Sequence, residues 1–112
     1  RKFTNLIMIV AHLKPPYYAV IFTTIKANNT SGYDKTALRM ESLAKKQNGF
    51  LGIESARTDL GITVSYWQSL ADIQKWRENI EHTEARILGK EKWYAQYQLR
   101  ICKVEHEYGF KK

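Results

Sequence analysis

The side chains best suited to hold a flat aromatic molecule are two tryptophans, Trp67 and Trp76, separated by eight residues. An indole combines a large apolar surface with one N–H donor, so a pair of indoles can stack on a planar substrate. Tyr66 and Tyr94 can add hydroxyl groups that hydrogen-bond to such a ligand. Rings at strand or helix spacing more often fill a core, and that alternative stays open at this point.

Three polar residues follow the second tryptophan: Asn79, His82 and Arg86. An imidazole titrates near neutral pH, so His82 can serve as a general base. On an unbroken helix it would lie about 240° around the axis from Trp76, on the solvent side. It reaches a pocket only if the helix breaks near Asn79, whose side chain can cap a new segment. Arg86 carries a fixed fork of donors for an anion or phenolate, although neighbouring glutamates equally predict solvated ion pairs.

The two tryptophans belong to different predicted elements. Over residues 61–67 apolar and polar side chains alternate, which predicts a strand that ends at Trp67. Ser69 is suited to cap a helix, and Asp72 stands three residues later as a variant of the capping box. Apolar residues then recur at helical spacing as Leu70, Ile73, Trp76 and Ile80. This switch of period places Trp76 on the inner side of a helix that follows the strand.

The remaining elements complete a known arrangement. Residues 17–26, 50–58 and 93–104 predict strands, and residues 33–47 predict a helix. A turn at 59–61 joins the second and third strands as an antiparallel hairpin. The order β-α-β-β-α-β with right-handed crossovers predicts an α+β, ferredoxin-like fold, a four-stranded antiparallel sheet with both helices on one face.

Strict alternation in the last strand puts Tyr97, Leu99 and Ile101 on one face and Tyr94 on the other. The first strand is apolar on both sides, so the sheet face away from the helices also needs a cover. A second sheet from a second subunit is the simplest cover, which predicts a twofold homodimer.

The composition places bounds on the partners. A chain of 112 residues fits one domain. Its 18 basic and 11 acidic residues give a net charge of +7, but no basic run exceeds two residues. We therefore expect no nucleic-acid partner. A polyanion binder is the weaker third alternative, and its binding would show a steep salt dependence. The single cysteine, Cys102, excludes an internal disulfide, and no Cys/His spacing predicts a zinc site.

Residues 1–14 predict a leader of uncertain order, followed by one domain over residues 15–112. The leader contains a short apolar run, Leu6 to Val10, behind Arg1 and Lys2. The run is too short for a membrane span and is not followed by a small-residue cleavage site. We expect a cytoplasmic protein without membrane contact, which agrees with the cysteine content.

Several segments, taken in order, resemble the antibiotic biosynthesis monooxygenase domain family: PPYYAVIF, GFLGIESAR, GITVSYW, the spacing of Trp67 and Trp76, and WYAQYQLRICKVEHEYGF. The resemblance covers nearly everything from Pro15 to Phe110 and is strongest to members without an established activity. It implies a dimeric α/β barrel with a pocket between helices and sheet in each subunit. Some members of the family oxidise polycyclic aromatic substrates with molecular oxygen and neither metal nor flavin, whereas relatives degrade haem.

The haem-degrading relatives use an asparagine on the first strand, a tryptophan on the second helical region and an iron-ligating histidine ten residues after it. Trp76 matches the tryptophan. The position ten residues later is Arg86, and residues 17–26 contain no asparagine. The comparison therefore argues against haem degradation.

Two functions remain as expectations. The first is a cofactor-independent monooxygenase that oxidises a small aromatic or quinol-like substrate with molecular oxygen. Its substrate-binding residues would be Trp67, Trp76, Tyr66 and Tyr94, and its catalytic residues His82, Asn79 and Arg86. The alternative is a non-catalytic dimeric barrel that binds a small ligand or haem, favoured by the absence of a compact set of acid, base and anion-stabilising residues.

Overall fold

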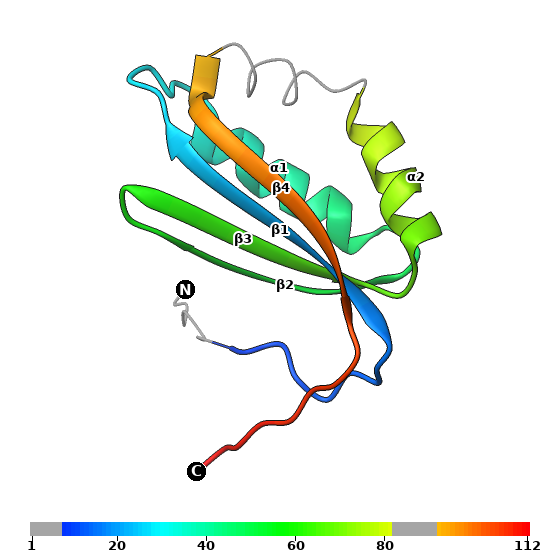
Figure 1. Cartoon of the computed structure of the whole chain (residues 1–112). Helices are drawn as coiled ribbons and strands as arrows, with labels where there is room; N and C mark the ends of the chain where they lie inside the picture. The colour runs from blue at the N-terminus through cyan, green and yellow to red at the C-terminus, as the bar shows by residue number, and fades with distance from the viewer. Residues whose placement is uncertain (1–7, 82–91) are drawn as a thin grey trace, which may run out of the picture.

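The computed structural model describes residues 8–81 and 92–112. Its elements are β1 (Tyr17–Lys26), α1 (Tyr33–Lys45), β2 (Phe50–Arg57), β3 (Leu60–Trp67), α2 (Leu70–Glu81) and β4 (Tyr94–Val104). The strands pair antiparallel in the order β2-β3-β1-β4. Both helices lie on one side of the sheet (Figure 1). The predicted ferredoxin-like α+β fold is therefore confirmed.

The element boundaries differ from the prediction by a few residues. Helix α1 ends at Lys45, and the hairpin between β2 and β3 is tighter than predicted. Arg57 pairs with Gly61, and the Thr58 N–H donates to the Leu60 carbonyl at 3.1 Å. Leu60 therefore belongs to β3 rather than to the turn. The predicted continuation of the second helical region beyond Glu81 lies outside the described residues. Neither helix of the described part is long and apolar enough to cross a lipid bilayer.

A β-bulge in β4 corrects one predicted orientation. Ile25 pairs with Gln96, but the next pair is Lys26 with Tyr94, so Ala95 is an extra residue. An extra residue reverses the alternation of side chains beyond it. The Tyr94 ring therefore lies on the helix side of the sheet, with its centroid 6.1 Å from that of Tyr97. Strict alternation had predicted these two rings on opposite faces, and that prediction was wrong.

The start of α2 has the predicted cap. The Ser69 hydroxyl oxygen accepts the Asp72 N–H at 3.1 Å, and the hydroxyl donates to the Asp72 carboxylate at 2.8 Å. The turn before β2 lies against this cap, because the Gln68 N–H donates to the Gly49 carbonyl at 2.7 Å. Gly49 has φ 81°, and a Cβ added there would overlap the Asp72 carboxylate. A glycine is therefore needed both for the backbone conformation and for this close approach.

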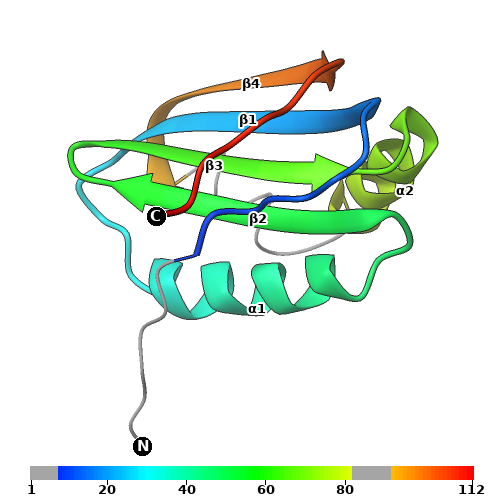
Figure 2. The same cartoon turned by 90° about the horizontal axis from the view of Figure 1, so that it is seen from below.

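Two segments, residues 8–14 and 105–112, lie on the side of the sheet away from the helices and are here called the N-terminal and C-terminal arms (Figure 2). Glu54 of β2 holds the first of these. Its carboxylate accepts the Tyr66 hydroxyl at 2.6 Å and the Val10 N–H at 2.9 Å. Val10, in the described part of the predicted leader, therefore lies against β2, and its side chain fills the space beside Gly52.

The C-terminal arm is held in the same way, by a glutamate carboxylate that accepts two hydrogen bonds. The Glu107 carboxylate accepts the Tyr17 hydroxyl at 2.6 Å and the Leu13 N–H at 3.1 Å. The Tyr17 and Tyr66 rings meet edge to face, with centroids 5.9 Å apart. Two tyrosines and two carboxylates thus join both arms to the ends of the two central strands, β1 and β3. The predicted homodimer, which would cover more of this face, stays a prediction.

Replacing Gly49 by alanine is expected to destabilise the fold more than the same change at Gly32. The two glycines have φ 81° and 82°, so both variants carry a backbone cost of about 1–2 kcal/mol. Only at Gly49 would the new methyl overlap a side chain, whereas at Gly32 it meets open space. Urea unfolding should show an additional loss of about 1–3 kcal/mol for Gly49→Ala. Equal losses in the two variants would contradict the proposed contact with Asp72.

The free energy of unfolding is expected to fall as the pH rises from about 10 to about 12. Burial and the hydrogen bond to Glu107 raise the pKa of Tyr17 from its usual 10.0 to about 12. In that window the unfolded chain loses the hydroxyl proton while the folded chain keeps it, so stability decreases with pH.

Urea unfolding at several alkaline pH values checks this expectation. The slope of stability against pH should become shallower in Tyr17→Phe. It should not change in Tyr108→Phe, whose ring is 99% exposed. A slope that Tyr17→Phe leaves unchanged would rule out the proposed contribution of this hydroxyl.

Candidate functional site

Helix α2 packs on the end of β3 through the two predicted tryptophans. Trp67 is fully buried, with 0% of its surface exposed. Its ring stacks on Trp76, with centroids 6.2 Å apart and planes 26° apart, and meets the edge of Phe50 at 5.4 Å. Its Nε1–H donates to the Ser65 hydroxyl oxygen at 2.9 Å. Because Trp67 is enclosed, a bound molecule can touch only the half-buried Trp76 of this pair.

A second group of rings lies at the opposite end of the same sheet face, and we call it the aromatic cluster. The Tyr94 ring meets Phe22 at 5.6 Å and Tyr33 at 5.8 Å, while Trp93 meets Tyr33 at 5.5 Å. The cluster consists of Phe22, Tyr33, Trp93, Tyr94 and Tyr97. These rings come from β1, β4, the residue before β4 and the first turn of α1, so they bring together segments distant in sequence.

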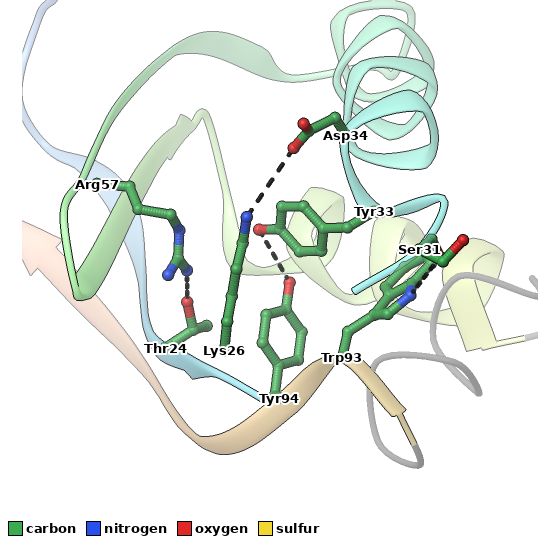
Figure 3. A network of polar contacts seen from close by, with 8 residues as sticks. All are labelled: Thr24, Lys26, Ser31, Tyr33, Asp34, Arg57, Trp93 and Tyr94. Carbon is green, nitrogen blue, oxygen red and sulfur yellow. Dashed lines mark hydrogen bonds and ion pairs between the residues drawn. The ribbon is translucent and has the colours of Figure 1, made fainter. Parts of the chain in front are cut away.

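Hydrogen bonds fix two of these rings (Figure 3). The Tyr94 hydroxyl donates to the Tyr33 hydroxyl oxygen at 3.3 Å, and the Trp93 Nε1–H donates to the Ser31 carbonyl at 3.2 Å. Burial, followed by the hydrogen bond with Tyr33, raises the pKa of Tyr94 well above its ordinary value. Its hydroxyl is therefore protonated at neutral pH and acts as a hydrogen-bond donor, not as a base.

Two cations border the aromatic cluster. The Arg57 guanidinium donates to the hydroxyl of Thr24, which is 3% exposed, and its Cζ lies 5.9 Å from the centroid of the Tyr33 ring. The Lys26 ammonium lies 4.0 Å from the same centroid. Lys26 also forms a long ion pair with Asp34, at 3.9 Å (Figure 3).

An accessible strip of side chains on β4 starts at Tyr97 of the aromatic cluster and runs toward the end of the sheet where the stacked tryptophans lie. Tyr97, Leu99 and Ile101 are 40%, 42% and 40% exposed. They stand opposite Thr24, Phe22 and Val20 of β1, on the helix side of the sheet. We call these three residues the β4 strip. The strip shares the helix side of the sheet with both groups of rings, and we take it as the candidate ligand-binding surface.

The predicted site residues are therefore not all in one place. Trp67, Trp76 and Tyr94 lie on the helix side, the first two at one end and Tyr94 at the other. Tyr66 lies on the opposite face, where its hydroxyl donates to Glu54, so the structure separates it from the other three. Asn79 is exposed on α2. His82 and Arg86 lie outside the described residues.

Two hollows lie elsewhere on the surface. One of about 330 Å³ is on the outer side of α1, and one of about 80 Å³ is near the hairpin end of the sheet. Neither is lined by a tryptophan. Within residues 8–81 and 92–112, no group of three or more His, Cys, Asp or Glu side chains is arranged to hold a metal ion.

Sequence reasoning missed Arg57, Thr24 and Tyr33. Only strand register brings the first two together, because Thr24 stands opposite Gly61 and Gly61 pairs with Arg57. A glycine paired with an arginine at the end of a hairpin was the available signal. It would have indicated that the arginine side chain could lie flat on the neighbouring strand.

Comparison with solved structures supports the fold. The cofactor-independent oxygenase SnoaB from Streptomyces nogalater superposes with a TM-score of 0.71 at 6% identity, over 83% of this chain and 97% of that one. A candidate antibiotic biosynthesis monooxygenase from Bordetella bronchiseptica gives a TM-score of 0.63 at 14% identity, over 80% and 98%. A second such candidate, from Nitrosomonas europaea, gives 0.62 at 13% identity, over 88% and 100%. At these identities the likeness concerns the fold alone.

Sequence comparison gives a closer relation. No family model matches the chain. The uncharacterized protein YqjZ of Bacillus subtilis is 50% identical over 96 residues, which cover 84% of each chain. The protein therefore belongs to the same family as YqjZ, and it has the fold of the antibiotic biosynthesis monooxygenases.

Proposed function

We propose that the protein is a cofactor-independent oxygenase that oxidises a small aromatic or quinol-like substrate with molecular oxygen. The single observation that carries the proposal is the accessible β4 strip, which extends from Tyr97 of the aromatic cluster through Leu99 and Ile101 toward the end of the sheet that carries the stacked tryptophans. Apolar and aromatic side chains of this kind suit a planar substrate. SnoaB, which shares the fold, is a cofactor-independent oxygenase, and this adds support by analogy.

The substrate itself must supply the electrons, because no ordinary side chain reduces oxygen. In an anthrone, the ring CH2 group is oxidised to a carbonyl. One oxygen atom becomes the carbonyl oxygen, and the other leaves as water with the two hydrogens of the CH2 group. The reaction balances without a reductant, so the protein has to bind the substrate, remove a proton and stabilise the resulting anion.

Different residues would carry these three tasks. Trp76 would support the substrate ring, with the buried Trp67 holding it in place from behind. The Tyr33 hydroxyl accepts a hydrogen bond from Tyr94 and can donate its own proton to a phenolate oxygen. We propose His82 as the base that removes the proton, and Asn79 and Arg86 as further donors to the anion.

The alternative is a non-catalytic protein that binds a small ligand or haem on the same surface. It is favoured by one observation: the β4 strip and the aromatic cluster contain no carboxylate or imidazole that could remove a proton, and Lys26 and Arg57 beside the Tyr33 ring are cations. Under this alternative the apolar surface retains its ligand without proton transfer.

We also propose that the protein acts as a homodimer in the cytoplasm. Apolar side chains of Ile25, Leu60 and Ile62 remain exposed on the sheet face away from the helices, where a second subunit would cover them. Cys102 is a free, exposed thiol on that face, which suits a reducing compartment. Light scattering of the purified protein measures the oligomeric state directly.

Oxygen uptake with anthrone and a panel of phenols tests the oxygenase. We expect His82→Ala to lower kcat by about 100-fold or more, because a general base is lost. We expect Trp76→Phe to lower kcat/KM by about 2- to 10-fold, because a smaller ring stacks less well. His106→Ala, in the exposed C-terminal arm, is the matched control and should retain full activity. If His82→Ala leaves the rate of oxygen uptake unchanged, His82 is not the general base.

A haem titration separates the oxygenase from the alternative. If the protein only binds, haem or an aromatic ligand should produce a saturable spectral shift without oxygen consumption. That result, together with no uptake for any phenol of the panel, would replace the oxygenase by the binding protein.

A further inference from the structure

Arg57 is held in a defined position by three other elements. Its guanidinium donates to the Thr24 hydroxyl of β1 and faces the Tyr33 ring of α1 (Figure 3). It also occupies the space beside Gly61 of β3, where any Cβ would overlap it. A solvent-exposed arginine would not pack in this way into the space that the missing Cβ of a glycine leaves open. The orientation of this guanidinium is therefore part of the fold.

The positive charge at this position is not balanced. Within residues 8–81 and 92–112, Arg57 forms no ion pair with a carboxylate. Lys26 brings a second cation to the same Tyr33 ring, and its own partner is Asp34, whose side chain is 94% exposed. An exposed ion pair is strongly screened by solvent. The half-buried guanidinium thus uses one of its five N–H groups on Thr24 and has others available for an anion.

The guanidinium lies at one end of the β4 strip. Thr24, its acceptor, stands directly opposite Tyr97, the first residue of the strip. Adjacent strands are about 4.8 Å apart, so the cation is close to the first ring of the strip. From Tyr97 to Ile101 the strip extends about 13 Å along β4. A planar molecule on the strip can therefore bring a substituent at its edge to Arg57.

From these contacts we infer that Arg57 binds the carboxylate of an aromatic acid whose ring lies on the β4 strip. The fork of the guanidinium matches a carboxylate with two parallel hydrogen bonds, which a neutral amide cannot reproduce. Lys26 adds a favourable charge at longer range. This inference rests on the proposed function for the use of the strip by a substrate, and it narrows that substrate to aromatic carboxylic acids.

Binding without turnover tests the inference. Three acids, benzoate, 2-naphthoate and anthracene-2-carboxylate, are titrated against the protein under nitrogen, each beside its neutral carboxamide. Intrinsic tryptophan fluorescence or calorimetry reports the affinity. We expect at least one acid to bind at least tenfold more tightly than its amide. The absence of any acid preference across all three pairs, including no binding at all, would overturn the inference.

Variants then assign the preference to Arg57. Arg57→Gln should abolish the difference between acid and amide, and Arg57→Lys, which keeps the charge but loses the fork, should reduce the difference without abolishing it. Arg39→Gln makes the same change of charge on the exposed side of α1 and should leave the preference intact. If Arg57→Gln weakens acid and amide equally, the residue serves only the fold, and the inference fails.

The anion site at Arg57 and the proposed oxygenase activity can fail independently, and the experiments distinguish the two failures. An acid preference that depends on Arg57, with no oxygen uptake for any compound, would retain the anion site and remove the oxygenase. Oxygen uptake with neutral phenols that Arg57→Gln leaves unchanged, without any acid preference, would retain the oxygenase and remove the anion site.

Discussion

The stacking of Trp76 on Trp67 is the contact on which the helix side of the molecule depends. Trp67 is the last residue of β3 and is completely buried. The ring of Trp76 stacks on it with the two planes 26° apart. Truncation of a buried tryptophan typically costs about 3–5 kcal/mol. The contact joins the end of a strand to the middle of the next helix, so it fixes how far α2 stands from the sheet.

The two faces of the sheet use tyrosine in different ways. On the face away from the helices, the hydroxyls of Tyr17 and Tyr66 donate to carboxylates and hold the arms of the chain. On the helix side, Tyr33 and Tyr94 hydrogen-bond to one another and border two cations instead. The first face therefore fastens the arms of the chain. On the second face, Arg57 forms no ion pair with a carboxylate within the described residues, and Lys26 has only a long ion pair with the exposed Asp34. This difference is the reason why the candidate site is assigned to the helix side.

The fold could be predicted from the sequence because its signals are local. The change from period two to period 3.6 after Trp67, the cap at Ser69 and the order of elements each depend on a few neighbouring residues. The structure confirms the cap and the element order directly. The proximity of the two indoles also followed from the change of period, although not the complete enclosure of Trp67.

The site could be predicted only in part because its geometry depends on pairing between strands. The meeting of Arg57 with Thr24 requires the register of three strands, which no local pattern specifies. Tyr66 is predicted to offer its hydroxyl to the same ligand as Trp67, yet neighbours on a strand point to opposite faces, and this hydroxyl donates to Glu54 instead. The roles proposed for His82 and Arg86 still rest on the sequence and the family resemblance.

The bulge at Ala95 has a consequence for how relatives of this protein are compared. One additional residue transfers the ring of Tyr94 from one side of the sheet to the other. A homologue lacking that insertion could carry the same aromatic residues in the same order and still display them on different surfaces. Gaps at the beginning of the final strand should therefore be placed with structural guidance when sequences of this family are aligned. A shift by a single position there assigns a side chain to the wrong face of the sheet.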